Sequence, residues 1–450
     1  MRIGFIAMSG VRAHNPELTR LGLTLPGFVE RNKIIASLPS LGLLTLAGLT
    51  PRDVRLGYHE VAELATCRTE FDFDAVAISS FSAQIPEAYC LADRLRAAGT
   101  RVILGGLHVT ALPEEAARHA DAVVIGEGEP VWPALVADLL RGELKPVYDA
   151  RPYPFDLALA PMPRFELLDP SRYNRLTVQT QRGCPFNCEF CAASIRLSPR
   201  YRVKPVTKVI AEIRRIKQIW PRPFIEFADD NTFANRRHGK RLLQALAPEK
   251  VRWFTETDIS VARDPVLLAM MRDAGCAQVL IGLESPAREG LSGLEMRSDW
   301  KSRQRDFYLE AIRRIQDHGI SVNGCFVLGL DGTGLESFDQ VREFVRESGL
   351  HEVQITIQTP FPGTPLYERL RREERLTHDG EWDRCTLFDV NFRPERMTAA
   401  ELERGFTALA RDLYGEAETT RRKEHFYRQL RASVRSRCAQ WRKGDERKMG

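Results

Sequence analysis

The sequence predicts an α/β fold: an open parallel sheet, then a partial (β/α)6 barrel, then a C-terminal helical extension. Short, nearly all-apolar segments alternate with longer segments of helical periodicity over residues 1–150 and again over residues 176–370. The proline-rich stretch 151–175 separates the two series and is expected to be a surface linker. Residues 371–450 form the predicted extension, which ends in a basic tail.

The first series predicts a Rossmann-like sheet with helices on both faces. Strands are expected at Arg2–Met8, Asp53–Tyr58, Ala75–Ser79, Val102–Gly106 and Ala122–Gly126, and helices at Ser40–Leu49 and Ile85–Ala98. Ligands of such sheets bind outside the carboxyl ends of the strands. The glycines at these ends allow a large flat ligand or a phosphate to approach the backbone, although tight turns use glycine as well.

The second series predicts the barrel, whose active site is expected where the strands end. Its strands are expected at Leu176–Thr180, Phe224–Phe227, Trp253–Thr257, Gln278–Leu283, Ser321–Leu328 and Glu352–Ile357. A helix over Val206–Trp220 is expected to bury Val209, Ile210, Ile213 and Ile216. After the barrel, Thr398 and Glu401 form a predicted capping box for a helix that reaches Tyr414.

The composition is that of a globular protein without a membrane partner. No apolar run approaches the roughly 20 residues of a membrane span, and the N-terminus lacks a signal-peptide pattern. Nine cysteines, an odd number, fit a reducing cytoplasm better than a disulfide framework. The net charge of +5 is mild, and the basic C-terminal tail is expected to be a solvated helix. Docking of an acidic partner or a nucleic acid on this tail is the less favoured alternative.

Three cysteines form a C-x3-C-x2-C run at Cys184, Cys188 and Cys191, directly after a predicted strand. Thiolates favour iron–sulfur clusters, zinc or copper. The next cysteine, Cys276, is far along the chain, so a four-iron cluster held here would keep one iron open for a small molecule. A structural zinc ion and three buried thiols are the alternatives.

This spacing, with the aromatic Phe190 before the last cysteine, resembles the signature of the radical S-adenosylmethionine (radical SAM) superfamily. The resemblance implies a [4Fe–4S] cluster on Cys184, Cys188 and Cys191, with S-adenosylmethionine (SAM) chelating the fourth iron. An electron from a donor such as flavodoxin or ferredoxin would cleave SAM to a 5'-deoxyadenosyl radical. The resemblance also implies a set of SAM-binding residues: Phe190, Arg202, Asp229, Asp230, Glu256, Glu284 and Ser285. Capping of the next helix is an alternative role for the Asp229-Asp230-Asn231 run.

The order G-G-x-H-x-T, P-E-E and G-E-G-E ahead of the cysteines resembles the N-terminal domain of cobalamin-dependent radical SAM proteins. So does the T-P-F-P-G-T-P-L-Y run at 359–367, and the resemblance extends over residues 1–415. It implies that cobalamin is bound by residues at the strand ends: Ser79, Ser80, Gly105, Gly106, His108, Thr110, Gly126, Glu127 and Gly128. There is no D-x-H-x-x-G motif to supply a histidine below cobalt. His108 is the candidate ligand, and a loop histidine that is hydrogen-bonded to the backbone is the alternative.

The resemblance implies methyl transfer to an unactivated carbon of a small-molecule or natural-product substrate, with cobalamin as the methyl carrier. One alternative is a radical cyclisation or rearrangement without methyl transfer, with cobalamin absent or used otherwise. A further alternative is a non-enzymatic sensor built on the corrin or the cluster. A tRNA-modifying enzyme is less favoured, because no separate RNA-binding module is recognisable.

Overall fold

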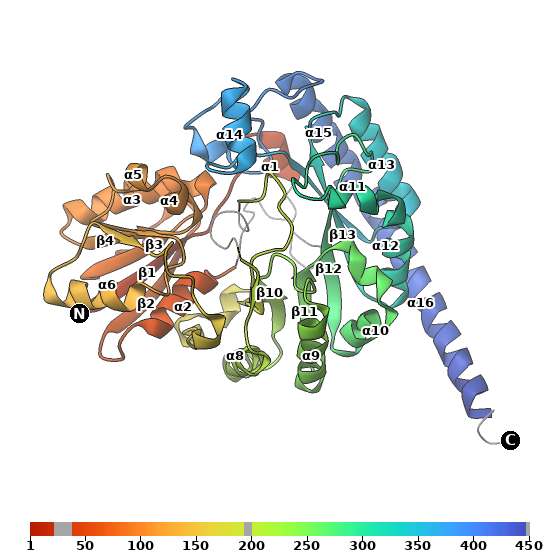
Figure 1. The fold of residues 1–450 in the computed structure, drawn as a ribbon, viewed down its shortest axis with the longest axis horizontal. Coiled ribbons are helices and arrows are strands. Elements are labelled where there is room, and N and C mark those ends of the chain that lie inside the picture. The colour runs from red at the N-terminus through yellow and green to blue at the C-terminus, as the bar shows by residue number, and fades with distance from the viewer. Residues whose placement is uncertain (22–37, 193–199, 447–450) are drawn as a thin grey trace. The chain divides into compact units, whose positions relative to one another are not determined.

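The computed structural model describes residues 1–21, 38–192 and 200–446, which form two compact units (Figure 1). Unit 1 combines most of residues 1–230 with residues 358–393. Unit 2 contains residues 231–357 and 394–450. The cysteine run and the first predicted sheet therefore belong to unit 1.

The first sheet of unit 1 has six parallel strands in the order β2-β1-β3-β4-β5-β6. They are β1 (Arg2–Met8), β2 (Arg55–Val61), β3 (Ala75–Ser79), β4 (Arg101–Gly105), β5 (Ala122–Ile125) and β6 (Val147–Asp149). The first five confirm the predicted strands to within a few residues. Strand β6 was not predicted, because three residues are too few to show a period. The order reverses between β1 and β3, which is where ligands of such sheets bind.

Helices cover both faces of this sheet, as predicted (Figure 1). Alternate strand residues face opposite sides, so Phe5 packs in one buried cluster with α2 and α6, whereas Ile6 packs in the other with α3 and α5. The helices are α1 (Pro16–Leu21), α2 (Leu41–Leu49), α3 (Ile85–Ala97), α4 (Leu107–Ala111), α5 (Pro113–Ala116) and α6 (Trp132–Arg141). Helix α2 ends before Pro51, which cannot continue it.

The stretch 151–175 packs more tightly than a segment laid over the surface. Its short 3-10 turns bury Phe165 and Tyr173, and the Tyr173 hydroxyl donates to Glu60 at 2.8 Å. This segment leads into β7 (Leu176–Val178), which pairs in parallel with β10 (Phe224–Phe227). Helix α8 (Val206–Ile219) buries the four apolar residues predicted for it.

Two short elements frame the cysteine run in unit 1. Strand β8 (Gln181–Arg182) pairs antiparallel with β9 (Arg202–Val203), and together they form the β8–β9 hairpin. Helix α14 (Pro365–Arg372) follows the proline-rich run, with Thr364 as its N-cap. Neither β8 nor β9 was predicted, since two residues carry no period.

Unit 2 contains parallel strands in the order β14-β13-β12-β11. They are β11 (Arg252–Glu256), β12 (Cys276–Glu284), β13 (Ser321–Leu328) and β14 (Glu352–Ile357), and all were predicted. The helices are α9 (Arg236–Leu246), α10 (Pro265–Asp273), α11 (Trp300–Gln304), α12 (Tyr308–Asp317), α13 (Glu336–Ser348), α15 (Ala399–Tyr414) and α16 (Glu416–Glu446). The α/β class with parallel sheets and a helical C-terminus is therefore confirmed.

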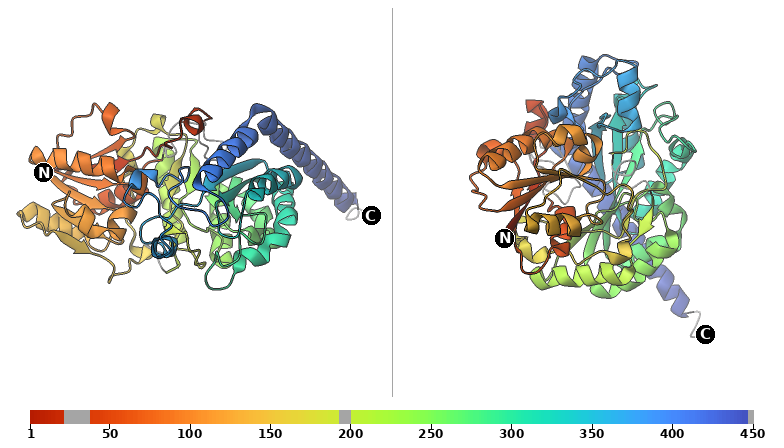
Figure 2. Two further views of the ribbon diagram at one scale, coloured as in Figure 1. Left: turned by 90° about the horizontal axis from the view of Figure 1, so that it is seen from above. Right: turned by 60° about the vertical axis from the view of Figure 1, so that its left-hand side comes forward.

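The C-terminal helices follow the prediction in part. The Thr398–Glu401 capping box begins α15. Helix α16 is not solvated throughout, because Arg422 and Phe426 are buried near its start and Arg422 donates to the Leu413 carbonyl at 2.8 Å. Its later part extends beyond the rest of unit 2 (Figure 2).

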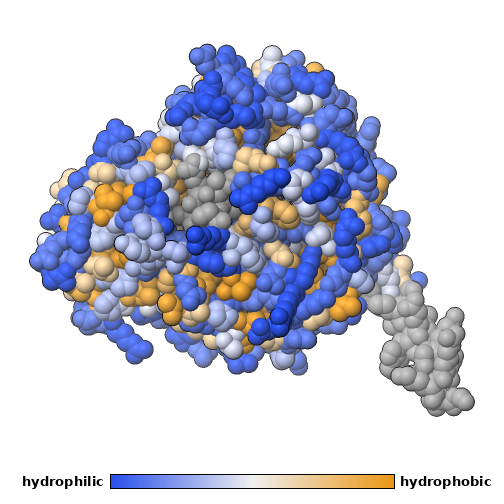
Figure 3. Space-filling model, in the orientation of Figure 1, coloured by the Kyte–Doolittle hydropathy of each residue, from blue (hydrophilic) through white to orange (hydrophobic). Residues whose placement is uncertain are grey.

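The molecular face in Figure 3 is mostly hydrophilic, with apolar side chains in small groups. Among the described residues, no helix combines the length and the apolar character that crossing a bilayer requires.

Candidate cofactor site

The cysteine run lies on a loop that begins where β8 ends. Cys184, Cys188 and Cys191 are each partly exposed, and the Cys191 amide donates to the Cys188 carbonyl at 3.1 Å. Phe190 is partly exposed beside them. Within the described ranges, no three His, Cys, Asp or Glu side chains converge on a position for a single metal ion. Three accessible cysteines on one short loop fit a four-iron cluster, which takes one thiolate per iron and keeps one iron open.

Asp229 fixes the backbone that leads into this loop. Its buried carboxylate accepts hydrogen bonds from the amides of Thr180 and Gln181 at 2.8 and 3.1 Å and from the Thr180 hydroxyl. These protein contacts fix the orientation of the carboxylate. The run does not cap the next helix, because Asn235 is the N-cap of α9. The capping alternative, which was open for Asn231, is therefore wrong.

Asp230 also contacts the loop. Burial raises the pKa of its carboxyl, and a hydrogen bond from the Gly183 amide and the charge of Arg182 offset this only in part. A carboxyl with a raised pKa beside the cysteine run is suited to hold or accept a proton. Asp230 accepts a hydrogen bond from the Gly183 amide, whereas Asp229 accepts three from Thr180 and Gln181.

Two glutamates of the G-E-G-E run form ion pairs with two arginines of the β8–β9 hairpin. We call these four side chains the clasp: Glu127, Glu129, Arg182 and Arg202. Arg182 contacts Glu129 at 2.7 Å and Glu127 at 3.4 Å. The Arg202 guanidinium makes a bidentate contact with the Glu127 carboxylate, in which Nη1 donates to Oε2 at 3.0 Å and Nη2 donates to Oε1. Arg202 Nη1 also donates to the Phe155 carbonyl at 2.6 Å. The Phe155 amide in turn donates to Glu127 at 3.1 Å.

The clasp explains an arrangement that would otherwise be unfavourable. Arg182 and Arg202 are directly opposite each other in the hairpin, where like charges destabilise a sheet. The two carboxylates compensate both cations, and all four side chains are at least four-fifths buried. Burial by itself would lower the pKa of Arg182, but the charges of Glu129 and Glu127 outweigh it and raise this pKa. Arg202 and Glu127, which were predicted to contact SAM and cobalamin, thus contact each other.

The other side of the loop is supported by α14. The Arg369 guanidinium contacts the carboxylate of Glu189 at 2.8 and 3.1 Å, and the Leu366 amide donates to the Glu189 carbonyl at 3.1 Å. Glu189 lies between the second and third cysteines. The proline-rich run therefore positions a helix that supports the cysteine loop. Sequence reasoning missed Glu189 and Arg369, as well as Arg182 and Glu129 of the clasp.

The strand ends of the first sheet carry most of the residues predicted to contact cobalamin. Ser79 ends β3 and Gly105 ends β4. Gly106 has φ of +107°, and a Cβ there would lie 3.2 Å from the Ser79 hydroxyl oxygen. The position thus demands glycine both for its backbone conformation and for space.

The remaining strand-end residues connect neighbouring strands or pack locally. The Thr110 hydroxyl accepts a hydrogen bond from the Gly126 amide at 2.9 Å, which joins helix α4 to the residue after β5. Ser80 is buried and donates to the Phe81 carbonyl at 2.9 Å, whereas the Phe81 ring itself is exposed. Gly128 lies in the G-E-G-E loop beside Leu46 of α2.

His108 is fully buried, and both of its ring nitrogens have partners. One contacts the Ser82 hydroxyl and the other the Glu115 carboxylate, each at 3.2 Å. Glu115 also accepts a hydrogen bond from the Trp382 indole at 3.1 Å. Burial would raise the pKa of Glu115, but hydrogen bonds from His108 and Trp382 outweigh it and lower this pKa. His108 is thus hydrogen-bonded, but the alternative was wrong in its details, because the residue lies on helix α4 and its partners are side chains rather than backbone. Cobalt ligation would require these contacts to break.

The predicted SAM-binding residues Glu256, Glu284 and Ser285 belong to unit 2. Glu284 is buried in the left-handed backbone region at φ of +61°, which is uncommon for a residue with a side chain. The Lys301 ammonium contacts its carboxylate and the Gly282 carbonyl, both at 2.7 Å. A Cβ at residue 282 would lie 2.3 Å from the Glu284 carboxylate, so glycine makes room for this ion pair. Strain held in place by an ion pair is typical of functional sites.

The other two predicted residues of unit 2, Glu256 and Ser285, differ from each other in their exposure. Glu256 is exposed at the end of β11. Ser285 is buried, and its hydroxyl accepts a hydrogen bond from the Ala287 amide at 3.1 Å. Cys325 lies opposite Gly282 on the neighbouring strand, and burial together with the charges of Glu284 and Glu256 raises the pKa of its thiol.

Two buried glutamines of unit 1, Gln181 and Gln358, have no hydrogen-bond partner for either amide atom among the described residues. A buried polar group without a partner costs roughly 1–3 kcal/mol. Gln181 lies three positions before Cys184, and Gln358 directly follows β14. Such amides fit a site that receives a polar cofactor.

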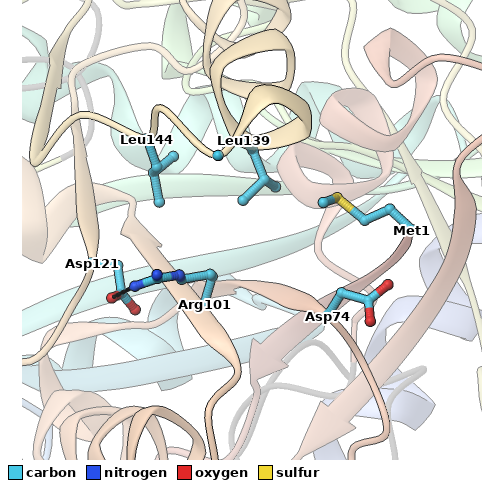
Figure 4. A pocket seen from close by; sticks show the side chains of 7 residues that line it. Met1, Asp74, Arg101, Asp121, Leu139 and Leu144 are labelled. Carbon is cyan, nitrogen blue, oxygen red and sulfur yellow. Dashed lines mark hydrogen bonds and ion pairs between the residues drawn. The ribbon is translucent and has the colours of Figure 1, made fainter.

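A pocket in unit 1 lies at the amino ends of the strands of the first sheet (Figure 4). The residues predicted to contact cobalamin are at the opposite, carboxyl ends of these strands. Arg101 and Asp121, at the amino ends of β4 and β5, form an ion pair at 3.0 Å within it. Met1 and Leu139 supply part of its apolar lining. Ligands of parallel sheets bind at the carboxyl ends, so this pocket is not the candidate site.

Three family models match the chain. Residues 178–345 match the radical SAM superfamily, residues 36–136 match the B12 binding domain, and residues 364–448 match a domain of unknown function, DUF4070. The chain is therefore an enzyme that carries both a radical SAM domain and a B12-binding domain. This composition implies a [4Fe–4S] cluster, SAM and cobalamin as cofactors.

Similar curated proteins include methyltransferases and a cyclase. The bacteriochlorophyllide d C-12(1)-methyltransferase of Chlorobaculum tepidum is 28% identical, over 76% of this chain and 75% of the relative. The hopanoid C-2 methylase of Rhodopseudomonas palustris is 29% identical, over 77% and 67%. The anaerobic magnesium-protoporphyrin IX monomethyl ester cyclase of Cereibacter sphaeroides is 26% identical, over 83% and 65%.

Among solved structures, the cobalamin-dependent SAM radical enzyme OxsB, with aqua-cobalamin and SAM bound, shares the fold with a TM-score of 0.68. It is 14% identical, and the match covers 94% of this chain and 72% of OxsB. This likeness shows the fold, and the two matched domains are the pair that the sequence resemblance implied.

Proposed function

We propose that this enzyme transfers a methyl group to an unactivated carbon of a small-molecule substrate. When bound, the cluster and SAM supply one-electron chemistry, and cobalamin supplies a methyl carrier. The clasp is the observation that carries the proposal, because it joins the strand-end loop of the B12-binding domain directly to the hairpin that holds the cysteines. The methyltransferases among the relatives favour methyl transfer over cyclisation.

Each group of residues has a proposed task. Cys184, Cys188 and Cys191 hold the cluster, and Asp229 with the clasp orients their loop. Asp230 faces the same loop and is suited to bind the amino group of SAM. In unit 2, Glu284, which Lys301 contacts at 2.7 Å, is suited to accept a hydrogen bond from a hydroxyl or ammonium group. The strand ends from Ser79 to Gly128 accept the corrin.

The domain boundaries 1–150, 151–175, 176–370 and 371–450 stay predictions, and so does a cytoplasmic location. A one-electron donor such as flavodoxin or ferredoxin is the proposed protein partner, since the cluster must be reduced from outside. The substrate is proposed to be a small molecule rather than a nucleic acid.

A labelled methyl group tests this function. The enzyme is reconstituted anaerobically with iron, sulfide and hydroxocobalamin, then incubated with reductant, trideuteromethyl-SAM and a small-molecule extract of the host cell. Methyl transfer predicts a product that gains the trideuteromethyl group, together with S-adenosylhomocysteine and 5'-deoxyadenosine in equal amounts. Release of 5'-deoxyadenosine without label in any product would instead favour cyclisation or rearrangement.

A further inference from the structure

Gln181 is a polar side chain that the described protein does not explain. It is fully buried, and neither its amide nitrogen nor its amide oxygen has a hydrogen-bond partner among the described residues. The side chains of its two neighbours in the chain do form hydrogen bonds: Thr180 with Asp229, and Arg182 with Glu129. Because burial of an unpaired amide opposes folding, an apolar residue would serve the unliganded protein better.

The hairpin fixes where this side chain lies. Pairing places Gln181 opposite Val203 and Arg182 opposite Arg202. Neighbouring residues of a strand face opposite sides, so Gln181 lies on the face turned away from the clasp. The backbone amide of Gln181 donates to Asp229 at 3.1 Å, which holds the residue three positions before Cys184.

We propose that Gln181 binds a cofactor group that presents a hydrogen-bond donor beside an acceptor. A glutamine amide offers both functions and pairs in a two-bond contact with a carboxamide or with the edge of adenine. This inference rests on the proposed function, in which the corrin supplies carboxamides and SAM supplies adenine. The charges of the clasp face the other side of the hairpin, so a neutral ligand edge suits the Gln181 side.

Unfolding of the apo protein gives the first test. Gln181→Met keeps the length of the side chain and removes both polar functions. We expect it to leave the apo melting temperature unchanged or to raise it. The matched control is Gln84→Met, because the buried Gln84 amide accepts from the Gly10 amide at 2.6 Å and donates to the Ala62 carbonyl at 3.2 Å. The control should lower the apo melting temperature, and an equal loss in Gln181→Met would overturn the inference.

Cofactor binding gives the second test, in two separate arms. Hydroxocobalamin binding is measured by absorbance after gel filtration, and SAM binding is measured by equilibrium dialysis of the cluster-loaded protein. We expect Gln181→Met to weaken one of them by tenfold or more. Loss of hydroxocobalamin affinity identifies a corrin carboxamide, and loss of SAM affinity identifies adenine. Unchanged affinity for both overturns the inference while leaving the proposed function intact. A wild-type protein that binds neither cofactor overturns both.

Discussion

Arg182 and Arg202 are opposite each other on neighbouring strands, an arrangement that depends on carboxylates supplied from far away in the chain. Glu129 is 53 residues from Arg182, and Glu127 is 75 residues from Arg202. Removing one member of such a buried set leaves a charge without its full compensation, which costs more than the intact pair contributes. Stability of the cysteine loop should therefore depend on the balance of charge rather than on any single residue.

A double-mutant cycle tests this dependence. Glu129→Gln and Arg182→Gln should each lower the free energy of unfolding, by about 3 kcal/mol, the low end for broken buried pairs because Arg182 keeps Glu127. The double variant should lose less than the sum, as measured by denaturant unfolding. The control is the exposed Arg141–Glu143 pair, whose two glutamine variants should behave additively. Full additivity in the Glu129 and Arg182 cycle would contradict the clasp.

The cysteines give a second prediction for single residues. Cys184→Ala, Cys188→Ala or Cys191→Ala should each abolish the cluster, because two thiolates cannot hold it. Iron analysis and 5'-deoxyadenosine release after anaerobic reconstitution measure this. Cys90→Ser, on the exposed side of α3, is the control and should retain both. Cys67, Cys276, Cys325 and Cys385 should also tolerate alanine with the cluster intact; Cys438 lies beyond the described side chains. Normal iron content in a variant of the run would refute its assignment.

Local pattern was enough to find some of these residues and not others. The cysteine spacing is contained within eight positions, so the sequence alone reveals it. The Glu189–Arg369 contact joins residues 180 positions apart, and no local period records such a partner. The strands that carry the glycine-rich ends were located correctly, and Glu127 at one of these ends contacts the cations Arg182 and Arg202. His108 and Glu115 are seven residues apart on two separate short helices, so no helical spacing could have paired them.

At the scale of elements, length decides what can be predicted. Strands of four to nine residues with apolar runs were located well, because burial on both faces produces a strong pattern. The β8–β9 hairpin consists of two pairs of residues, yet it carries the clasp, Gln181 and the entry to the cysteine loop. Its geometry depends on tertiary contacts with Asp229 and the G-E-G-E loop, which a sequence pattern does not contain.

Helix α16 provides a pH-dependent element. His351, next to β14, stacks on Phe426 of α16 with ring centroids 4.4 Å apart, and its ring contacts the Ser321 hydroxyl at 2.6 Å. Burial, together with the charges of Lys423 and Arg422, lowers the pKa of His351 to about 4. The unfolded chain therefore binds a proton at this residue more readily than the folded chain between pH 6.5 and 4.

Stability should fall as the pH falls through that window and should be fully retained above pH 6.5. The loss at its lower end is roughly 3 kcal/mol for a shift of this size. Thermal unfolding measured at several pH values checks the slope, and His351→Phe should reduce it while preserving the stacked contact. A slope that is unchanged in His351→Phe would assign the titration to another group.

At the scale of the whole molecule, two units and three implied cofactors make a single unfolding transition unexpected. Hydroxocobalamin is predicted to bind at the first sheet, which is part of unit 1. At a concentration one hundred times its dissociation constant, it should stabilise the folded state of that unit by about 2.7 kcal/mol. Calorimetry should show one transition moving upward while the other stays in place. A uniform shift of every transition would contradict binding confined to unit 1.

Unit 1 is discontinuous in sequence, and this affects the order of events during synthesis. Residues 231–357 emerge from the ribosome before the segment that completes unit 1. Leu366 and Arg369, which hold Glu189, and Trp382, which holds Glu115, are all in that late segment. Domains generally fold as they are translated, N-terminal parts first. The nascent chain therefore exposes the three cysteines through most of its elongation, and iron delivered before residue 369 has emerged meets a loop without its final support.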